Sequence, residues 1–188
     1  MRHWPRAAGP HASGLAAGLA VALAIAVASV GGCAPALDWR QVQTEGWGLA
    51  AAMPCRPDRL QRQIALAGAP VTLGLLVCSS AEHTFALASA EVDSPAQVGP
   101  ALQALLAAAQ ANVQGQVLAE QPARVPGMTP QPGALRRQLA GRMPDGRAVQ
   151  EQVQVFAHGL RVFQSTVVGP QAGAAQVEPF LDSLALSR

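Results

Sequence analysis

The feature that most restricts the fold is a repeated alternation of apolar and polar residues with a period of two. In residues 60–66 one row of alternate positions is apolar apart from Arg62, and the other row contains Gln61 and Gln63. Apolar side chains again occupy alternate positions in residues 71–77, and a Gly-Ala-Pro turn at 68–70 separates the two runs. This period is that of a β-strand with one buried face. We therefore expect an antiparallel hairpin here, preceded by a strand over 47–53 and followed by one over 83–91.

A second hairpin is expected in the C-terminal half of the chain. Residues 135–143 and 147–156 flank Pro144-Asp145-Gly146, and the second run alternates Val with Gln. An Asp-Gly pair between such runs indicates a tight turn in which both central residues have positive φ. Further strands are expected over 116–120 and 160–168, and the segment 125–133, rich in Pro and Gly, is expected to be a loop.

The first of two helical segments follows the strand over 83–91. Ser94 is a candidate N-cap, with a Pro just inside and a Gln three residues on, as in a capping box. Pro100 conflicts with a continuous helix, so a start at Gly99 stays open. Leucines at helical spacing continue toward Gly115, a candidate C-terminal stop.

The second helical segment closes the chain, with apolar residues at helical spacing from Val177 onward and Pro179 in its first turn. The order of elements is strands, helix, strands, helix. This order predicts an α+β fold over residues 45–188, a mainly antiparallel sheet flanked by two helices. A single domain of this size buries about 70% of its unfolded surface, which is enough for one core.

The N-terminal segment has the pattern of an export signal. Arg2, His3 and Arg6 form a short basic region, and residues 15–30 carry no charged side chain. A helix of that length spans roughly 24 Å, less than the ~30 Å hydrocarbon core of a bilayer. Small residues then lead to Cys33. We therefore expect residues 1–32 to be a signal peptide rather than a membrane-spanning helix.

The sequence Val30-Gly31-Gly32-Cys33 resembles the lipobox of bacterial lipoproteins. The resemblance implies that Cys33 is acylated and becomes the first residue of the mature protein. Ala at position 34 implies the periplasmic face of the outer membrane. Residues 33–44 are then expected to be a lipidated tether ahead of the domain. Two alternatives stay open: ordinary signal cleavage that leaves Cys33 as a free thiol, and an N-terminal segment that is not cleaved and serves as the anchor.

Charge and composition exclude several classes of function. The mature part balances 11 Arg against 11 acidic residues, so the chain has no basic field for nucleic acid. All basic residues are Arg, and Tyr is absent. Schiff-base lysines, a P-loop lysine and tyrosine general acids are therefore excluded.

Cys55 and Cys78 are the cysteines that remain after lipidation. An exported protein reaches an oxidising compartment, and the predicted hairpin folds these two cysteines toward each other, so we expect a disulfide. It would close a loop of about two dozen residues and stabilise by roughly 3–4 kcal/mol. Two separate buried thiols are the alternative. No metal site is expected, because the two thiols with His83 and His158 lack zinc-like spacing.

Five short motifs follow one another along the mature chain: Gly46-Trp47 to Pro54, Pro126-Gly127, Asp145-Gly146, Val168-Gly169-Pro170 and Phe180-Leu181-Asp182-Ser183. Their order resembles the small exported bacterial relatives of PsbP, the extrinsic photosystem protein with an α-β-α sandwich. Met53, Cys55 and Leu184 depart from that pattern, where these relatives more often carry Phe, Gly and Phe. The resemblance implies a sandwich fold and a non-enzymatic or unknown role, and it supplies no catalytic residues.

Three glutamines form the most distinctive polar feature of the predicted domain. Gln150, Gln152 and Gln154 lie on one face of a strand and could form a binding surface. A solvated sheet face is the alternative that we favour, because antiparallel sheets commonly leave one side in water. Arg136 and Arg137 are strand neighbours that point to opposite faces, so we expect solvated charges rather than a shared anion clamp.

The sequence shows no catalytic constellation. His83 and His158 are expected to be exposed near turns, and neither a G-x-S-x-G nor an H-E-x-x-H motif occurs. Residues 46–51 match the dinucleotide pattern G-x-G-x-x-A, but Pro54 prevents the helix that must follow. Asp182-Ser183 is expected to cap or pack. We therefore expect no cofactor and no enzymatic activity.

These patterns favour a lipid-anchored periplasmic envelope protein that acts as an interaction or accessory module. Its partners would be the membrane, through the anchor, and an envelope protein, but not nucleic acid. The alternative is a periplasmic lipoprotein that binds a small ligand between sheet and helix. A third hypothesis is an envelope hydrolase that uses His83 or His158 with a carboxylate.

Overall fold

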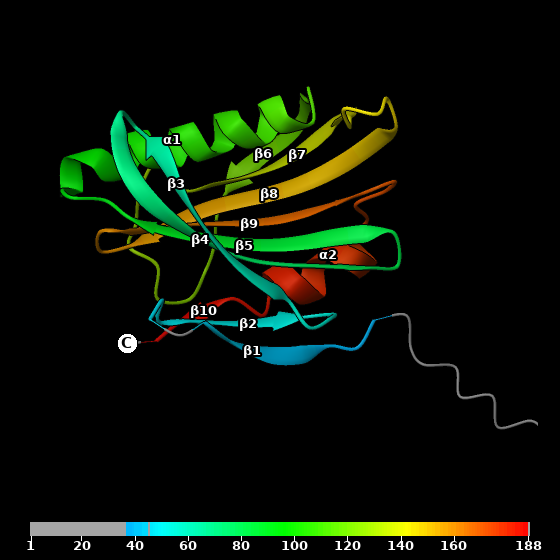
Figure 1. The fold of residues 1–188 in the computed structure, drawn as a ribbon, viewed down its shortest axis with the longest axis horizontal. Coiled ribbons are helices and arrows are strands. Elements are labelled where there is room, and N and C mark those ends of the chain that lie inside the picture. Colours follow the sequence, from blue (N-terminus) through cyan, green and yellow to red (C-terminus); the bar gives the residue numbers. More distant parts are fainter. Residues whose placement is uncertain (1–36, 45, 188) are drawn as a thin grey trace, which may run out of the picture. The chain divides into compact units, whose positions relative to one another are not determined.

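A seven-stranded antiparallel sheet is the centre of the fold, and helices lie on both of its faces (Figure 1). The computed structural model describes residues 37–187 except Glu45, so the expected signal peptide and Cys33 lie outside the described residues. The strand order is β3-β4-β5-β9-β8-β7-β6. Their bounds are β3 Asp58–Leu66, β4 Ala69–Ser80, β5 His83–Glu91, β6 Gln116–Pro122, β7 Leu135–Arg142, β8 Ala148–His158 and β9 Arg161–Gly169.

The sheet is built from two meanders joined at its centre. Strands β3, β4 and β5 follow one another as hairpins, and strands β6 to β9 do the same. Helix α1 (Pro95–Asn112) carries the chain from β5 to the far edge at β6. The second meander then returns until β9 pairs with β5, with Leu87 opposite Ser165. Both predicted hairpins are therefore confirmed.

The two hairpin turns are of different kinds. The β3–β4 turn has positive φ at both Ala67 and Gly68, 52° and 83°. In the β7–β8 turn only Gly146 has positive φ, and its N–H donates to the Met143 carbonyl at 2.8 Å. The expectation of positive φ at both Asp145 and Gly146 is therefore wrong. A longer loop closed by one glycine joins these strands instead.

Helix α1 begins directly after Ser94 and runs through Pro100. The Gln97 side-chain oxygen accepts hydrogen bonds from the backbone N–H groups of Asp93 and Ser94, at 2.9 and 3.2 Å. This cap holds the first turn, so the later start at Gly99 is not observed, although Pro100 removes one intrahelical hydrogen bond. The apolar side of α1 packs on strands β8 and β9. Its buried residues are Val98, Ala101, Leu102, Leu105, Leu106 and Ala109.

The opposite face of the sheet carries helix α2 (Ala174–Leu181) and a three-stranded sheet of β1 (Arg40–Thr44), β2 (Leu49–Met53) and β10 (Ala185–Leu186) (Figure 1). Phe85 of β5 joins these parts. Its ring makes edge contacts with Trp39 before β1, at 6.0 Å between centroids, and with Phe180 of α2, at 5.8 Å. Aromatic pairs in this geometry add attraction beyond the apolar area that they bury.

The α+β class, with two helices and mainly antiparallel strands, is confirmed, but the small sheet was not expected. Residues 40–44 form β1, so the prediction of a tether over 33–44 is wrong for these five residues. Helix α2 ends at Leu181, and residues 185–186 pair with β2 as β10. Both strands are short, and their pairing partner β2 decides their conformation.

A disulfide joins Cys55, which follows β2, to Cys78 of β4, with their Cα atoms 5.9 Å apart. The sequence separation is 23 residues. The predicted pairing of these cysteines is therefore present in the structure, and it closes the connection between the small sheet and the first hairpin.

Candidate functional site

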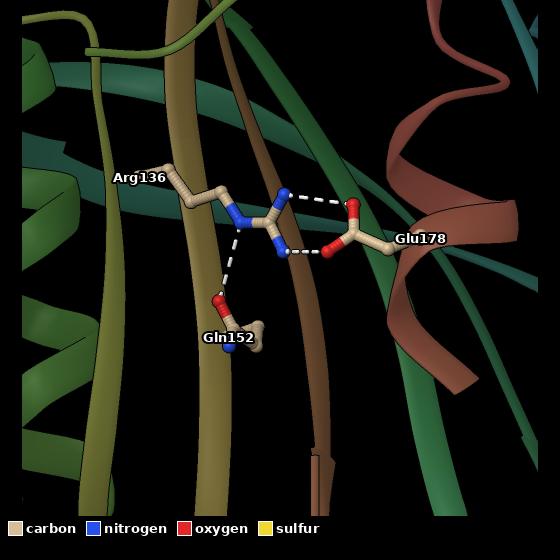
Figure 2. A network of polar contacts seen from close by, with 3 residues as sticks. All are labelled: Arg136, Gln152 and Glu178. Carbon is tan, nitrogen blue, oxygen red and sulfur yellow. Dashed lines mark hydrogen bonds and ion pairs between the residues drawn. The ribbon is translucent and has the colours of Figure 1, made fainter. Parts of the chain in front are cut away.

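The polar site with the most complete geometry is built around Arg136 on the face of the sheet that carries α2. Figure 2 shows its guanidinium between Gln152 of β8 and Glu178 of α2. Two N–H groups donate to the two Glu178 oxygens at 2.7 and 3.0 Å, and Arg136 Nε donates to Gln152 Oε1 at 3.2 Å. We call these three residues the Arg136 cluster. It fastens α2 to the central sheet by a bidentate ion pair.

The burial of the Arg136 cluster changes its electrostatics. The Arg136 side chain is 14% exposed and that of Glu178 is 40% exposed. Hydrogen bonding from the Arg136 guanidinium, helped by its positive charge, holds the pKa of Glu178 below its ordinary value. Arg137, the next residue, instead pairs with Glu120 of β6 at 2.6 Å. The two arginines therefore serve separate partners, as their opposite directions predicted, but Arg136 is not a solvated charge.

The three glutamines of β8 lie on the side of the Arg136 cluster, but they do not form a solvated face. Gln152 is 9% exposed and Gln154 is 4% exposed. Gln150 Oε1 accepts a hydrogen bond from the Ala172 N–H at 3.3 Å, just before α2. The favoured interpretation of a solvated face is wrong for Gln152 and Gln154, because α2 and its preceding loop cover this side of the sheet. Strand periodicity shows which residues share a face but not what covers it.

Gln154 has an unusual environment. Its side-chain nitrogen is, among the described residues, the one buried side-chain nitrogen or oxygen atom that lacks a hydrogen-bond partner. Gln154 lies opposite Arg136 on β7 and Ser165 on β9. A buried polar group without a partner costs about 1–3 kcal/mol. Such an atom in a native fold calls for a physical explanation, such as a bound water or ligand.

Two open hollows flank Arg136. The smaller one, about 130 Å³, lies over Gln138 and Gln152. The larger one, about 190 Å³, lies between the end of β6, the start of β7 and the C-terminus of α2, and we call it the Gln154 hollow. Its lining residues are Gln121, Pro122, Arg124, Arg136, Gln154, Leu181 and Asp182. The site therefore combines two arginines, a carboxylate and a buried amide around a small space.

A wider depression of about 480 Å³ lies at the three-stranded sheet, bordered by Val42, Leu49 and Leu186. Its polar border includes Gln41, Thr44 and Ser187, and none of the described residues that line it has a titratable side chain. The Thr44 hydroxyl donates to the Leu49 carbonyl. This depression offers space but few groups that could orient a ligand.

The two histidines lie apart from the Arg136 cluster. His83 contacts the carbonyl oxygens of Ala81 and Gln171, both at 2.6 Å, and His158 Nδ1 contacts the Gly127 carbonyl at 2.9 Å. Both ring nitrogens of His83 and Nδ1 of His158 therefore contact backbone carbonyl oxygens rather than a carboxylate. The hydrolase hypothesis required a histidine paired with a carboxylate. No such pair is present in the described residues, which are 37–187 except Glu45.

Ser183 and Asp182 fulfil the capping and packing role expected of them. The Ser183 hydroxyl donates to the Phe180 carbonyl at 2.7 Å and accepts from the Ala52 N–H at 2.8 Å. It ties the end of α2 to β2. Asp182 is the C-cap of α2, which places its carboxylate at the rim of the Gln154 hollow.

Glu151 is a titratable residue that the sequence reasoning did not single out. It lies on the α1 side of β8, between Leu139 of β7 and Val168 of β9, and is 3% exposed. Burial raises its pKa to about 7. The sequence contained a signal for this burial. Glu151 occupies a valine position in the alternation of Val with Gln along this strand, so its side chain points to the apolar face.

The described residues show neither a metal-ligand cluster nor a membrane-spanning helix. No three His, Cys, Asp or Glu side chains in this part of the chain come close enough to hold a metal ion. None of the helices within it is long and apolar enough to cross a bilayer.

Comparisons with known proteins leave the function open. No family model matches the sequence, and no curated protein matches it. A crystal structure from Bacteroides thetaiotaomicron VPI-5482 is similar over 75% of this chain and 46% of that one, at 9% identity and a TM-score of 0.39. This chain thus spans less than half of that chain. A similarity at this level carries no argument about function.

Proposed function

We propose that this chain is an exported lipoprotein, anchored through Cys33 at the periplasmic face of the outer membrane, whose folded domain docks a partner protein. The disulfide between Cys55 and Cys78 supports export, because disulfides persist in oxidising compartments such as the periplasm. The lipid anchor itself rests on the resemblance of residues 30–33 to a lipobox.

The observation that carries the docking role is the outer edge of β6. Within the part of the chain that the structure describes, this strand pairs only with β7, so one row of its backbone N–H and C=O groups points away from the sheet. Val117 and Leu118 on it are 42% and 56% exposed, which is unusual for large apolar side chains in this domain. Leu118 lies at a register shift between Val117 and Ala119, so it has no partner on β7.

We infer that an extended segment of an envelope protein adds to this edge as a further strand. Strand addition uses backbone hydrogen bonds for affinity and side-chain contacts for specificity. The irregular register at Leu118 and the proline at position 122 prevent indiscriminate pairing along the whole edge, since both interrupt a regular ladder. The exposed apolar pair then provides the specific contact.

Kinship to the small PsbP-like proteins is part of this proposal, and the order of layers supports it. A central antiparallel sheet between helices on its two faces is the layer order that this kinship requires (Figure 1). Under this proposal the chain has an accessory role and no catalytic centre.

The test is site-specific photocrosslinking in the native cells. A photoreactive residue at Leu118 is expected to capture a discrete partner band, which is lost when Cys33→Ala releases the protein from the membrane. The matched control is the same residue at Leu60 on β3, which is 45% exposed at the opposite edge of the sheet. Equal capture at both positions, or capture of a second copy of this chain alone, would overturn the proposal. Native mass without a diacylglyceryl group on Cys33 would remove the anchor from it.

Binding of a small ligand is the second candidate function. The observation that favours it is the Gln154 hollow, where charged groups of both signs surround an amide whose nitrogen has no partner. The hollow is open at the surface of the domain. It therefore differs from the expected site, in which a ligand is held between the sheet and a helix.

A further inference from the structure

We propose that the Gln154 hollow binds a small zwitterion, a molecule with a carboxylate and an ammonium group close together, such as a free α-amino acid. This inference goes beyond the docking role of β6 and does not depend on the lipid anchor. It gives the second candidate function a site and a class of ligand.

Gln154 places a buried amide at the hollow. The residue is 4% exposed, it lines the hollow, and its side-chain nitrogen has no hydrogen-bond partner. The nitrogen itself has almost no accessible surface, so a ligand with an acceptor atom would satisfy it once the amide turns toward the hollow. Rotation of the amide exchanges its donor and acceptor ends, so the same side chain can present either end to a bound molecule.

Charged side chains of both signs line the hollow. Arg124 and Arg136 provide positive charge on the side of strands β6 and β7. Asp182 provides negative charge at the C-terminus of α2, the end of a helix that favours cations. An anion alone would meet the Asp182 carboxylate, and a cation alone would meet the two guanidinium groups. A molecule that carries both charges can place each one against its opposite.

The Arg136 side chain is preorganised for binding. Arg136 is held from two sides, by Glu178 and by Gln152 (Figure 2). A guanidinium has five N–H donors, and the Arg136 cluster uses three of them, so two remain for a further acceptor. A side chain that is already fixed loses little freedom when a ligand binds. The positive wall of the hollow is therefore in place before the ligand arrives.

The size of the hollow selects among zwitterions. Its volume of about 190 Å³ is below the roughly 300–1,000 Å³ of pockets for drug-sized ligands. Leu181 supplies an apolar contact at its wall. The hollow therefore suits a molecule of a few heavy atoms with a short side chain.

The experiment is a titration of the full protein, isolated from its own cells in a mild detergent, followed by nitrogen–proton correlation spectroscopy. The side-chain amide signal of Gln154 is assigned by its loss in Gln154→Met. L-Alanine is expected to shift this signal, whereas acetate and methylammonium, each with one of the two charges, bind at least tenfold more weakly. Arg124→Ala and Asp182→Asn should each weaken L-alanine binding about tenfold or more. The matched control Arg62→Ala, an exposed arginine on β3, should leave it unchanged.

Several outcomes would overturn the inference. Acetate that binds as tightly as L-alanine would make this a simple anion site. An unmoved Gln154 signal at about 10 mM L-alanine would mean that no zwitterion of this class fills the hollow. None of these results bears on the crosslinks expected at Leu118, so failure of the zwitterion site and failure of the docking function are distinguishable.

Discussion

Replacement of Glu151 by glutamine tests how burial controls the stability of this domain. Glu151 is 3% exposed on β8, where it lies between Leu139 of β7 and Val168 of β9. Burial raises its pKa from 4.5 to about 7. Glutamine has nearly the same shape and remains neutral at every pH, so the substitution removes the ionisation and keeps the packing.

The sign and size of the effect follow from proton linkage. Well below its ordinary pKa of 4.5, the Glu151 carboxyl is protonated in both the folded and the unfolded state, and its ionisation has no influence on stability. Between the two pKa values the folded state binds more protons than the unfolded state, so the free energy of unfolding decreases as pH rises. The decrease stops above the folded pKa of about 7. A shift of about 2.5 units corresponds to roughly 3 kcal/mol.

Urea denaturation of wild type and Glu151→Gln across this pH range is the assay. We expect the variant to be more stable by up to about 3 kcal/mol above about pH 8, with the difference shrinking to nearly zero below about pH 4. Glu82→Gln, at an exposed turn, is the control and should show no such pH-dependent gain. If the difference between wild type and Glu151→Gln is constant over the whole range, the reasoning about burial is refuted.

Three further predictions concern the packing of the fold and its links. Gly141→Ala should lower the free energy of unfolding by about 1–3 kcal/mol, because the added Cβ meets the backbone carbonyl of Val113 in the α1–β6 connection. Gly133→Ala is the control, because the nearest atoms to a Cβ added there lie at 3.7, 3.8 and 3.9 Å, which is ordinary contact; equal losses of stability in thermal unfolding of the two variants would contradict this. Replacing both Cys55 and Cys78 by Ala should lower the free energy of unfolding, measured with denaturant, by about 3–4 kcal/mol. Reductant should lower the stability of the wild type but should not change that of the variant. Glu178→Gln should cost about 1–3 kcal/mol at neutral pH; because the pKa of Glu178 is lowered, this loss should disappear as pH falls through that lowered value, and a loss that persists in acid would argue against the ion pair.

The main elements of the fold were predictable because they rest on local signals. The hairpin over β3 and β4 and the strand β5 were expected from period-two alternation and turn residues, and β5 has the predicted bounds 83–91. The start of α1 was expected from its capping residues. Two details failed for physical reasons: Pro100 is tolerated inside a helix that is well capped, and the β7–β8 turn needs one positive φ rather than two.

The candidate site could be predicted only in part. Periodicity correctly placed Gln150, Gln152 and Gln154 on one face of β8 and sent Arg136 and Arg137 to opposite faces. It could not show that α2 lies over that face, because the helix arrives from the end of the chain. The link between Arg136 and Glu178 spans 42 residues and has no sequence signature.

The sequence by itself determined the α+β class, the hairpins, the first helix and the pairing partners of the disulfide, because each depends on residues close along the chain or on the scarcity of cysteines. Only the tertiary structure decided that β1 and β10 join β2, that two glutamines are buried, and that the Gln154 hollow forms between β6, β7 and α2. These features depend on which distant surfaces meet, and that choice is made by the packing of the whole domain rather than by any local pattern.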